Sequence, residues 1–178
     1  MARNRAPSGK GERPKAEAES GKLKAENRIG ERRKNVNSEG GKFTVTGPPA
    51  AIDIEIRVRY AEVDPMGALH HSRYWVYFEM GRTELLRAGG IAYADLEREG
   101  VLFVVARCAA KFLQPARYDD LLVLTTRIVK MGAARIDHAY ELKRKRDGLL
   151  LATAETTLAC VGRDGQLQPI PESIRSPA

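Results

Sequence analysis

A strand that leads directly into a long amphipathic helix constrains the fold of this chain more than any other feature. Apolar residues fill every second position over nine residues and predict a half-buried strand: Ile52, Ile54, Ile56, Val58 and Tyr60. The period then becomes helical over residues 72–88, where the apolar face comprises Tyr74, Phe78, Gly81 and Leu85. Ser72 is the expected N-cap, and Gly89-Gly90 ends the helix.

The remainder of the chain has mainly the pattern of strands. Residues 91–99 predict a shorter helix, and four strands are expected at 101–112, 121–131, 134–146 and 149–161. Asp147-Gly148 predicts a two-residue type I′ hairpin between the last two strands. Because the strands are segregated from one long helix, the predicted class is α+β. The last four strands would form a meander in an antiparallel sheet packed on that helix.

The first 49 residues differ from the rest in charge and in apolar content. Residues 1–50 hold 12 of the 30 Lys and Arg and 6 of the 23 Asp and Glu, which leaves 18 basic and 17 acidic residues for 51–178. With few sizeable apolar residues, 1–49 is predicted to be a disordered basic arm and 50–178 the folded domain. No helix-turn-helix pattern or interleaved aromatic set accompanies the arm. A solvated tail is therefore preferred over a nucleic-acid-binding one.

The cysteines and the lack of apolar runs bear on the compartment. Cys108 and Cys160 have neither the spacing of a disulfide framework nor that of a metal site. The arm lacks the apolar run of a signal peptide, and its acidic residues disfavour a transit peptide. No segment reaches the length of a transmembrane helix. These observations predict a reducing, cytoplasmic location.

Asp64 is the residue most suggestive of chemistry. It stands where the strand ends, just before a turn at Pro65 and Gly67 and the start of the long helix. The free N–H groups of a first helical turn carry partial positive charge and suit a developing oxyanion. A base or nucleophile beside such a hole is what acyl transfer requires. The segment therefore predicts an acyl-transfer site.

Two blocks of residues resemble the 4-hydroxybenzoyl-CoA thioesterase family, whose relatives include the Tol–Pal-associated acyl-CoA thioesterases. The first is Asp64-Pro65-Met66-Gly67 followed by His71-Ser72-Arg73-Tyr74, then Phe78-Glu79 with Arg82 and Glu84. The second runs from Lys111 to Leu121, and the resemblance covers about residues 54–163. It implies a hotdog fold, in which a five-stranded antiparallel sheet wraps around one long central helix. Such proteins form homodimers or tetramers with active sites between subunits.

The resemblance also implies a reaction and its residues. The protein is expected to be an acyl-CoA thioesterase that needs no cofactor or metal and takes an acyl-CoA or an acyl-carrier-protein substrate. Asp64 would be the nucleophile or general base, and the backbone N–H of His71 would polarise the thioester carbonyl. Gly67 and Tyr74 are taken as substrate-binding residues. Relatives often carry a hydroxyl or thiol just before the catalytic Asp, whereas this chain has Glu62-Val63-Asp64.

Several of these residues have a plainer interpretation. An Asp before Pro is often only a turn residue. Metal binding at His70-His71 is disfavoured because adjacent side chains diverge and no third ligand is near. Tyr74 and Trp75 are more typical of a core than of an acyl pocket, although a helix that forms the floor of the pocket can supply both. Glu79 is expected to pair with Arg82, and Cys108 to be a buried thiol.

Two other functions compete with the thioesterase. A hotdog dehydratase or hydratase is disfavoured because Asp64 precedes His70 and His71 by six and seven positions, not by the spacing of those enzymes. The second alternative is a non-catalytic acyl-thioester-binding protein whose basic arm binds nucleic acid or an acidic partner. The presence of Asp64 and the lack of a DNA-reading motif disfavour it. For a CoA substrate, the run Lys143-Arg144-Lys145-Arg146 offers basic groups for the phosphates, although for any single residue a solvated strand end is the preferred interpretation.

Overall fold

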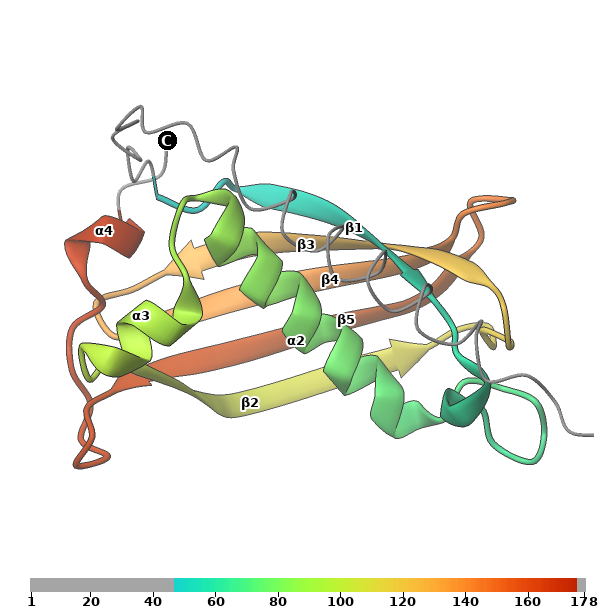
Figure 1. Ribbon diagram of the computed structural model, residues 1–178, viewed down its shortest axis with the longest axis horizontal. Coiled ribbons are helices and arrows are strands. Elements are labelled where there is room, and N and C mark those ends of the chain that lie inside the picture. The colour runs from blue at the N-terminus through green and yellow to red at the C-terminus, as the bar shows by residue number, and fades with distance from the viewer. Residues whose placement is uncertain (1–46, 176–178) are drawn as a thin grey trace, which may run out of the picture. The chain divides into compact units, whose positions relative to one another are not determined.

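The computed structural model describes residues 47–175, and the sheet in it has five strands. These are β1 (Ala51–Arg57), β2 (Leu102–Phe112), β3 (Leu121–Met131), β4 (Arg135–Arg144) and β5 (Leu150–Val161). All neighbours are antiparallel, in the order β1-β3-β4-β5-β2 (Figure 1). The predicted α+β class is confirmed.

The predicted four-strand meander is wrong at its first strand. β3, β4 and β5 follow one another, but β2 pairs with β5 at the far edge of the sheet. β1 already occupies the open edge of β3, with Asp53 opposite Thr125. The chain after β2 therefore crosses the end of the sheet to reach β3, and residues 113–120 make that crossing.

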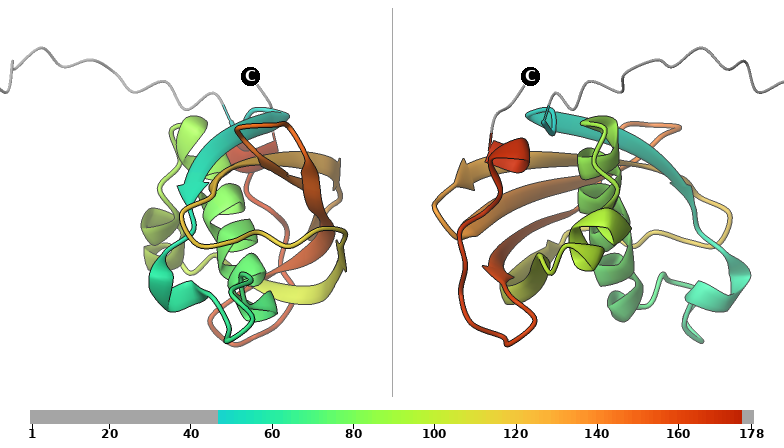
Figure 2. Two further views of the ribbon diagram at one scale, coloured as in Figure 1. Left: turned by 90° about the vertical axis from the view of Figure 1, so that its right-hand side faces the viewer. Right: turned by 60° about the vertical axis from the view of Figure 1, so that its left-hand side comes forward.

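The long helix α2 (His71–Ala88) lies in the hollow of the curved sheet, which curls around it (Figures 1 and 2). Its buried residues are the four of the predicted apolar face, Tyr74, Phe78, Gly81 and Leu85, together with Tyr77, which was not predicted. At Gly81 the helix approaches the sheet so closely that a Cβ atom would lie 2.9 Å from Cδ2 of Leu124 and nearer still to Oγ1 of Thr126. Glycine is therefore needed here to let the helix lie close to β3.

Three short helices complete the domain: η2 (Tyr60–Glu62), α3 (Tyr93–Arg98) and α4 (Glu172–Arg175). The predicted short helix at 91–99 is confirmed as α3. The predicted N-cap is wrong, because His70 caps α2 and its Nδ1 accepts a hydrogen bond from the Ser72 backbone N–H at 3.3 Å. An imidazole nitrogen thus does what was expected of the Ser72 hydroxyl.

The core consists of two groups of buried side chains along α2. One includes Tyr74, Tyr77 and Phe78 packed against Leu122, Leu124, Tyr140 and Leu142 of the sheet. The other surrounds α3 and α4 and includes Ile91, Leu96, Ile136, Cys160, Ile170 and Ile174. The two groups lie beneath different halves of the helix, and this division separates the two cavities described below.

Two further expectations need correction. Only Gly148 of the β4–β5 turn has positive φ, at 69°, whereas a type I′ turn needs positive φ at Asp147 as well. The observed loop is longer, with the Gly148 N–H donating to the Arg144 carbonyl at 2.8 Å. Cys108 is exposed instead of buried, because β2 is an edge strand.

The predicted arm lies outside the described residues except for 47–49. Pro48 is fully buried, so the folded domain begins before residue 50. No helix within residues 47–175 is long and apolar enough to cross a membrane. The cytoplasmic location and the disorder of the arm stay predictions.

Candidate active site

The turn at Asp64 is held by its own side chain. Oδ1 accepts hydrogen bonds from the backbone N–H groups of Met66 at 2.9 Å and Ala68 at 3.2 Å. The Asp64 carbonyl accepts from the Gly67 N–H at 2.9 Å, and Gly67 has φ of 71°, which glycine adopts without strain. One carboxylate oxygen is thus used for the turn. Oδ2 makes no hydrogen bond with the described residues.

The beginning of α2 supplies hydrogen-bond donors next to this turn. The His70 N–H donates to the Glu62 carbonyl at 2.9 Å, and the Arg73 N–H donates to the His70 carbonyl at 2.9 Å. The His71 N–H, at the first helical position, has no acceptor among the described residues. It is one of the free donors that a helix N-terminus presents to an anion.

Asp64 and His71 line the same cleft of about 330 Å³. The cleft is also lined by Leu69, Tyr74 and Phe112, the last residue of β2, and by three residues of the β2–β3 connection: Leu113, Gln114 and Pro115. The Tyr74 and Phe112 rings meet edge to face with centroids 4.9 Å apart. The cleft thus combines a carboxylate, a free N–H group and two aromatic side chains.

A buried carboxylate in η2 fixes the start of the helix. Glu62 accepts hydrogen bonds from the Arg59 N–H at 2.8 Å, the Arg59 guanidinium at 2.6 Å and the Tyr77 hydroxyl at 2.7 Å. Burial alone raises the pKa of Glu62, but these bonds outweigh it and hold the pKa at about 2. Burial, and then the bond to Glu62, raises the pKa of Tyr77. Glu62 therefore stays ionised and ties η2 to α2.

The structure brings three of the four predicted site residues together and leaves one aside. Asp64, His71 and Tyr74 share the cleft, whereas Gly67 shapes the turn without lining it. The Arg117 guanidinium lies over Gly67, since Nη1 would be 3.7 Å from a Cβ atom there. Gln114 and Glu62 were not predicted as site residues. The second block of the resemblance contains Gln114, but nothing in the local pattern distinguishes Glu62 from an exposed acid.

Other expectations about charged residues are settled by their contacts. Glu79 and Arg82 form the predicted ion pair at 3.0 Å. Every member of the Lys143–Arg146 run lies within 4.0 Å of a carboxylate. Binding of CoA phosphates by this run stays a prediction. The His70 and His71 rings do not diverge, since their centroids are 4.2 Å apart. Within residues 47–175 no group of three His, Cys, Asp or Glu could hold a metal ion.

Comparison with known proteins identifies the family of the chain. A family model described as the thioesterase-like superfamily matches residues 58–177. The chain belongs to the thioesterase-like superfamily. This membership confirms the predicted resemblance and the predicted enzyme class.

Individual relatives within the superfamily cover most of the folded domain. The putative acyl-CoA thioesterase YneP of Bacillus subtilis is 34% identical over 110 residues, 62% of this chain and 79% of that protein. The acyl-CoA thioesterase YbgC of Haemophilus influenzae is 32% identical over 124 residues, 68% of this chain and 89% of that protein. A solved structure of a probable thioesterase from Bartonella henselae is 31% identical with a TM-score of 0.65, over 68% of this chain and 100% of that one. The hotdog fold is confirmed.

Proposed function

We propose that this protein hydrolyses acyl-CoA thioesters to a free acid and CoA, with Asp64 as the catalytic carboxylate. The observation that carries the proposal is that Asp64 and the free His71 N–H line one cleft. Membership of the thioesterase-like superfamily and the names of the two bacterial relatives support the substrate class.

The contacts of Asp64 define how the step would proceed. With Oδ1 held by the turn, Oδ2 faces the reaction and takes a proton from water as the oxygen attacks the thioester carbonyl carbon. The His71 N–H stabilises the oxyanion, and loss of one such donor typically costs about 3–4 kcal/mol. The C–S bond then breaks, and the thiolate leaves and takes up a proton. Direct attack by Oδ2 on the carbonyl carbon, followed by hydrolysis of the anhydride, gives the same products.

The apolar side chains of the cleft would hold the acyl group of the substrate. Tyr74 is buried, and Phe112 and Leu113 are half exposed at the mouth. Val63, which stands where relatives often have a hydroxyl or thiol, packs its side chain against the core. It offers Asp64 no hydrogen bond, and among the described residues only the N–H groups of the turn orient the carboxylate.

We further propose that the active form is a homodimer or tetramer. Within residues 47–175, β2 pairs with β5 on one side only, and it carries the exposed apolar side chains of Val104 and Val105. An unpaired apolar edge favours pairing with another strand. The cleft lies at the end of this edge, because Phe112 is the last residue of β2. Light scattering on active protein tests the assembly, and an active species that remains monomeric would contradict it.

The catalytic proposal is tested by thiol release from a panel of short, long and aromatic acyl-CoAs, with acyl-carrier-protein substrates in parallel. Wild-type protein should hydrolyse at least one thioester, and Asp64→Asn should lower its kcat at least about a hundredfold. The exposed strand residue Asp53 provides the matched control, since Asp53→Asn makes the same chemical change away from the cleft. Equal activity of the two variants would rule out the role of Asp64.

A further inference from the structure

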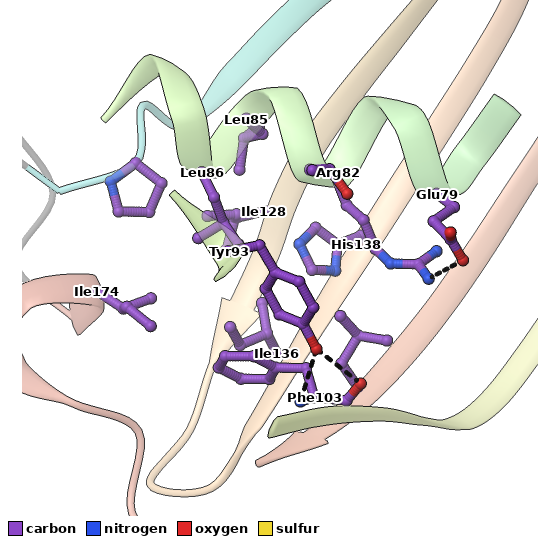
Figure 3. A pocket seen from close by; sticks show the side chains of 13 residues that line it. Glu79, Arg82, Leu85, Leu86, Tyr93, Phe103, Ile128, Ile136, His138 and Ile174 are labelled. Carbon is purple, nitrogen blue, oxygen red and sulfur yellow. Dashed lines mark hydrogen bonds and ion pairs between the residues drawn. The ribbon is translucent and has the colours of Figure 1, made fainter. Parts of the chain in front are cut away.

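A second cavity, of about 180 Å³, lies between the C-terminal half of α2, α3 and the sheet. Its walls are mostly aliphatic and aromatic, and its floor comes from β3, β4 and β5 (Figure 3). The aliphatic side chains around it include Leu85, Leu86, Ile128, Ile136, Leu158 and Ile174. An apolar cavity of about 150 Å³ is enough to bind benzene. This one therefore has room for a single ring or a chain of about six to eight carbons.

One side of this cavity is polar, and one of its buried groups has no hydrogen-bond partner among the described residues. His138 is buried, with only 4% of its surface exposed, and its Nδ1 makes no hydrogen bond with the described residues. Burial, and then the charge of Arg82, lowers the pKa of His138 to about 4. The imidazole is thus neutral at neutral pH and presents one donor and one acceptor. A buried polar group without a partner costs free energy unless a ligand or water meets it.

Arg82 lies beside His138 at the same side of the cavity (Figure 3). Its side chain is only 16% exposed, and among the described residues its one ion pair is with Glu79 through Nη2. Glu79 is 66% exposed, so this pair contributes little. A guanidinium has five N–H donors, and a planar carboxylate can bind two of them at once.

The cavity is separated from the Asp64 cleft by packed side chains. Tyr77 and Phe78 lie between Tyr74 and Arg82 along the helix, and the Phe78 ring packs on Tyr140 at 4.8 Å. His71 and Arg82 are eleven residues apart, or roughly 16 Å along a helix. The two sites therefore do not join within one protomer.

We propose that this cavity is a second binding site, for a small apolar carboxylic acid. One aromatic ring or a chain of about six to eight carbons fills the apolar part, and the carboxylate binds Arg82 and His138. This site does not depend on the catalytic role of Asp64. The acid is either the product of the proposed reaction or an unrelated metabolite of the same class.

Titration calorimetry of the full chain with benzoate and with hexanoate tests the site directly. Wild type and Asp64→Asn should bind alike, which separates this proposal from that of the active site. Ile128→Phe fills the apolar part and should weaken binding of both acids at least about tenfold. Absence of binding to wild type up to about 10 mM would overturn the proposal.

The head-group contact has its own variant, which serves if Ile128→Phe does not fold. Arg82→Met keeps the length of the side chain but removes its charge. It should weaken benzoate at least about tenfold while leaving benzyl alcohol within about twofold. Arg87→Met is the matched control, because Arg87 is on the same helix and pairs with Glu84 away from the cavity. Equal binding of benzoate by the Arg82 and Arg87 variants would overturn the assignment.

Inhibition of thioester hydrolysis distinguishes the cavity from the cleft. An acid in the cavity should inhibit without competing with acyl-CoA, and Ile128→Phe should abolish that inhibition. Purely competitive inhibition that survives Ile128→Phe would place the acid in the Asp64 cleft and contradict the proposal. Whether the product acid of the preferred substrate binds more tightly than benzoate or hexanoate then identifies the source of the ligand.

Discussion

The two halves of α2 are packed in opposite ways. Beneath the N-terminal half, Tyr74, Tyr77 and Phe78 fill the space above the sheet, and the cleft lies outside this packing, at the end of the helix. Beneath the C-terminal half, Gly81 brings the helix close to β3, and beyond it a cavity remains beside His138. One half is filled by large side chains, and the other encloses space.

The difference shows how one helix can serve two kinds of site. The Asp64 cleft uses the free N–H groups at the helix N-terminus, so it needs a firmly held helix end, which the Glu62 hydrogen bonds provide. The cavity uses side chains on the helix flank, so it needs room and not a helix end. The catalytic site thus lies at the helix end, where backbone N–H groups are free, and the binding site lies along the helix, where the packing leaves space. The predictions below test this division.

The largest expected effect separates the two regions by activity. Asp64→Asn should lower kcat at least about a hundredfold, whereas Arg82→Met should change it by less than about threefold. The reason is that, of these two residues, Asp64 lines the cleft together with His71 and Arg82 does not. Thiol-release kinetics on both variants provide the measurement, and a comparable loss in Arg82→Met would show that the cavity belongs to the catalytic site.

Glu62→Gln should destabilise the N-terminal region in a pH-dependent way. The folded-state pKa of about 2 lies below the ordinary value of 4.5, so this carboxylate stabilises the fold above pH 4.5 and loses that contribution as the pH falls toward 2. The variant should lose about 2–3 kcal/mol at pH 7 and show a flatter pH dependence below pH 4.5. Urea unfolding from pH 3 to 7 measures both, and an unchanged acid limb would contradict the role of Glu62.

Gly81→Ala should destabilise the fold although alanine favours helices. The new methyl group would overlap Oγ1 of Thr126, and relieving such overpacking costs about 1–3 kcal/mol. The double variant Gly81→Ala with Thr126→Ala removes the nearest atom and should recover most of the loss. Thermal unfolding compares the three proteins. A Gly81→Ala variant as stable as wild type would show that the helix can move away from β3 at little cost.

Protonation of His138 should make the stability of the fold depend on pH in a range different from that of Glu62. Its folded-state pKa of about 4 is below the ordinary 6.5, so the unfolded chain takes up the proton first and stability falls as the pH drops from 6.5 toward 4. Between pH 6.5 and 5.5 the loss should be about 1 kcal/mol. His138→Gln should abolish this slope, and Glu62→Gln should leave it intact. Urea unfolding in that pH range checks the difference.

Removal of the N-terminal arm should have the smallest effect of these changes, provided that the buried Pro48 is kept. A chain that begins at Gly47 should keep its melting temperature within about 2 °C, since few apolar residues precede it. One that begins at Ala50 should melt a few degrees lower, roughly 2–5 °C, because Gly47 and Pro48 pack closely against Gly89. Equal melting temperatures would show that this packing contributes nothing.

The local patterns were sufficient for the elements and for the centre of the site. Period-two alternation and the helical repeat predicted β1 and α2, because both depend on which face of a segment is buried. Asp64, His71 and Tyr74 share a cleft because they lie within eleven residues of chain around one turn. The position of β2, by contrast, depends on which strand edges remain unpaired, and that is a property of the whole sheet.

The remaining features were decided by tertiary contacts between distant segments. His70 caps the helix, Cys108 is exposed, and Glu62 is a buried anion, and each outcome depends on neighbours that local sequence does not specify. The second cavity joins residues from α2, α3, α4 and four strands, so no short motif could predict it. Sequence by itself determined the elements and the site within one turn of chain, because those interactions are local. The tertiary structure decided strand order, burial and the cavity, because each depends on the packing of segments far apart in the chain.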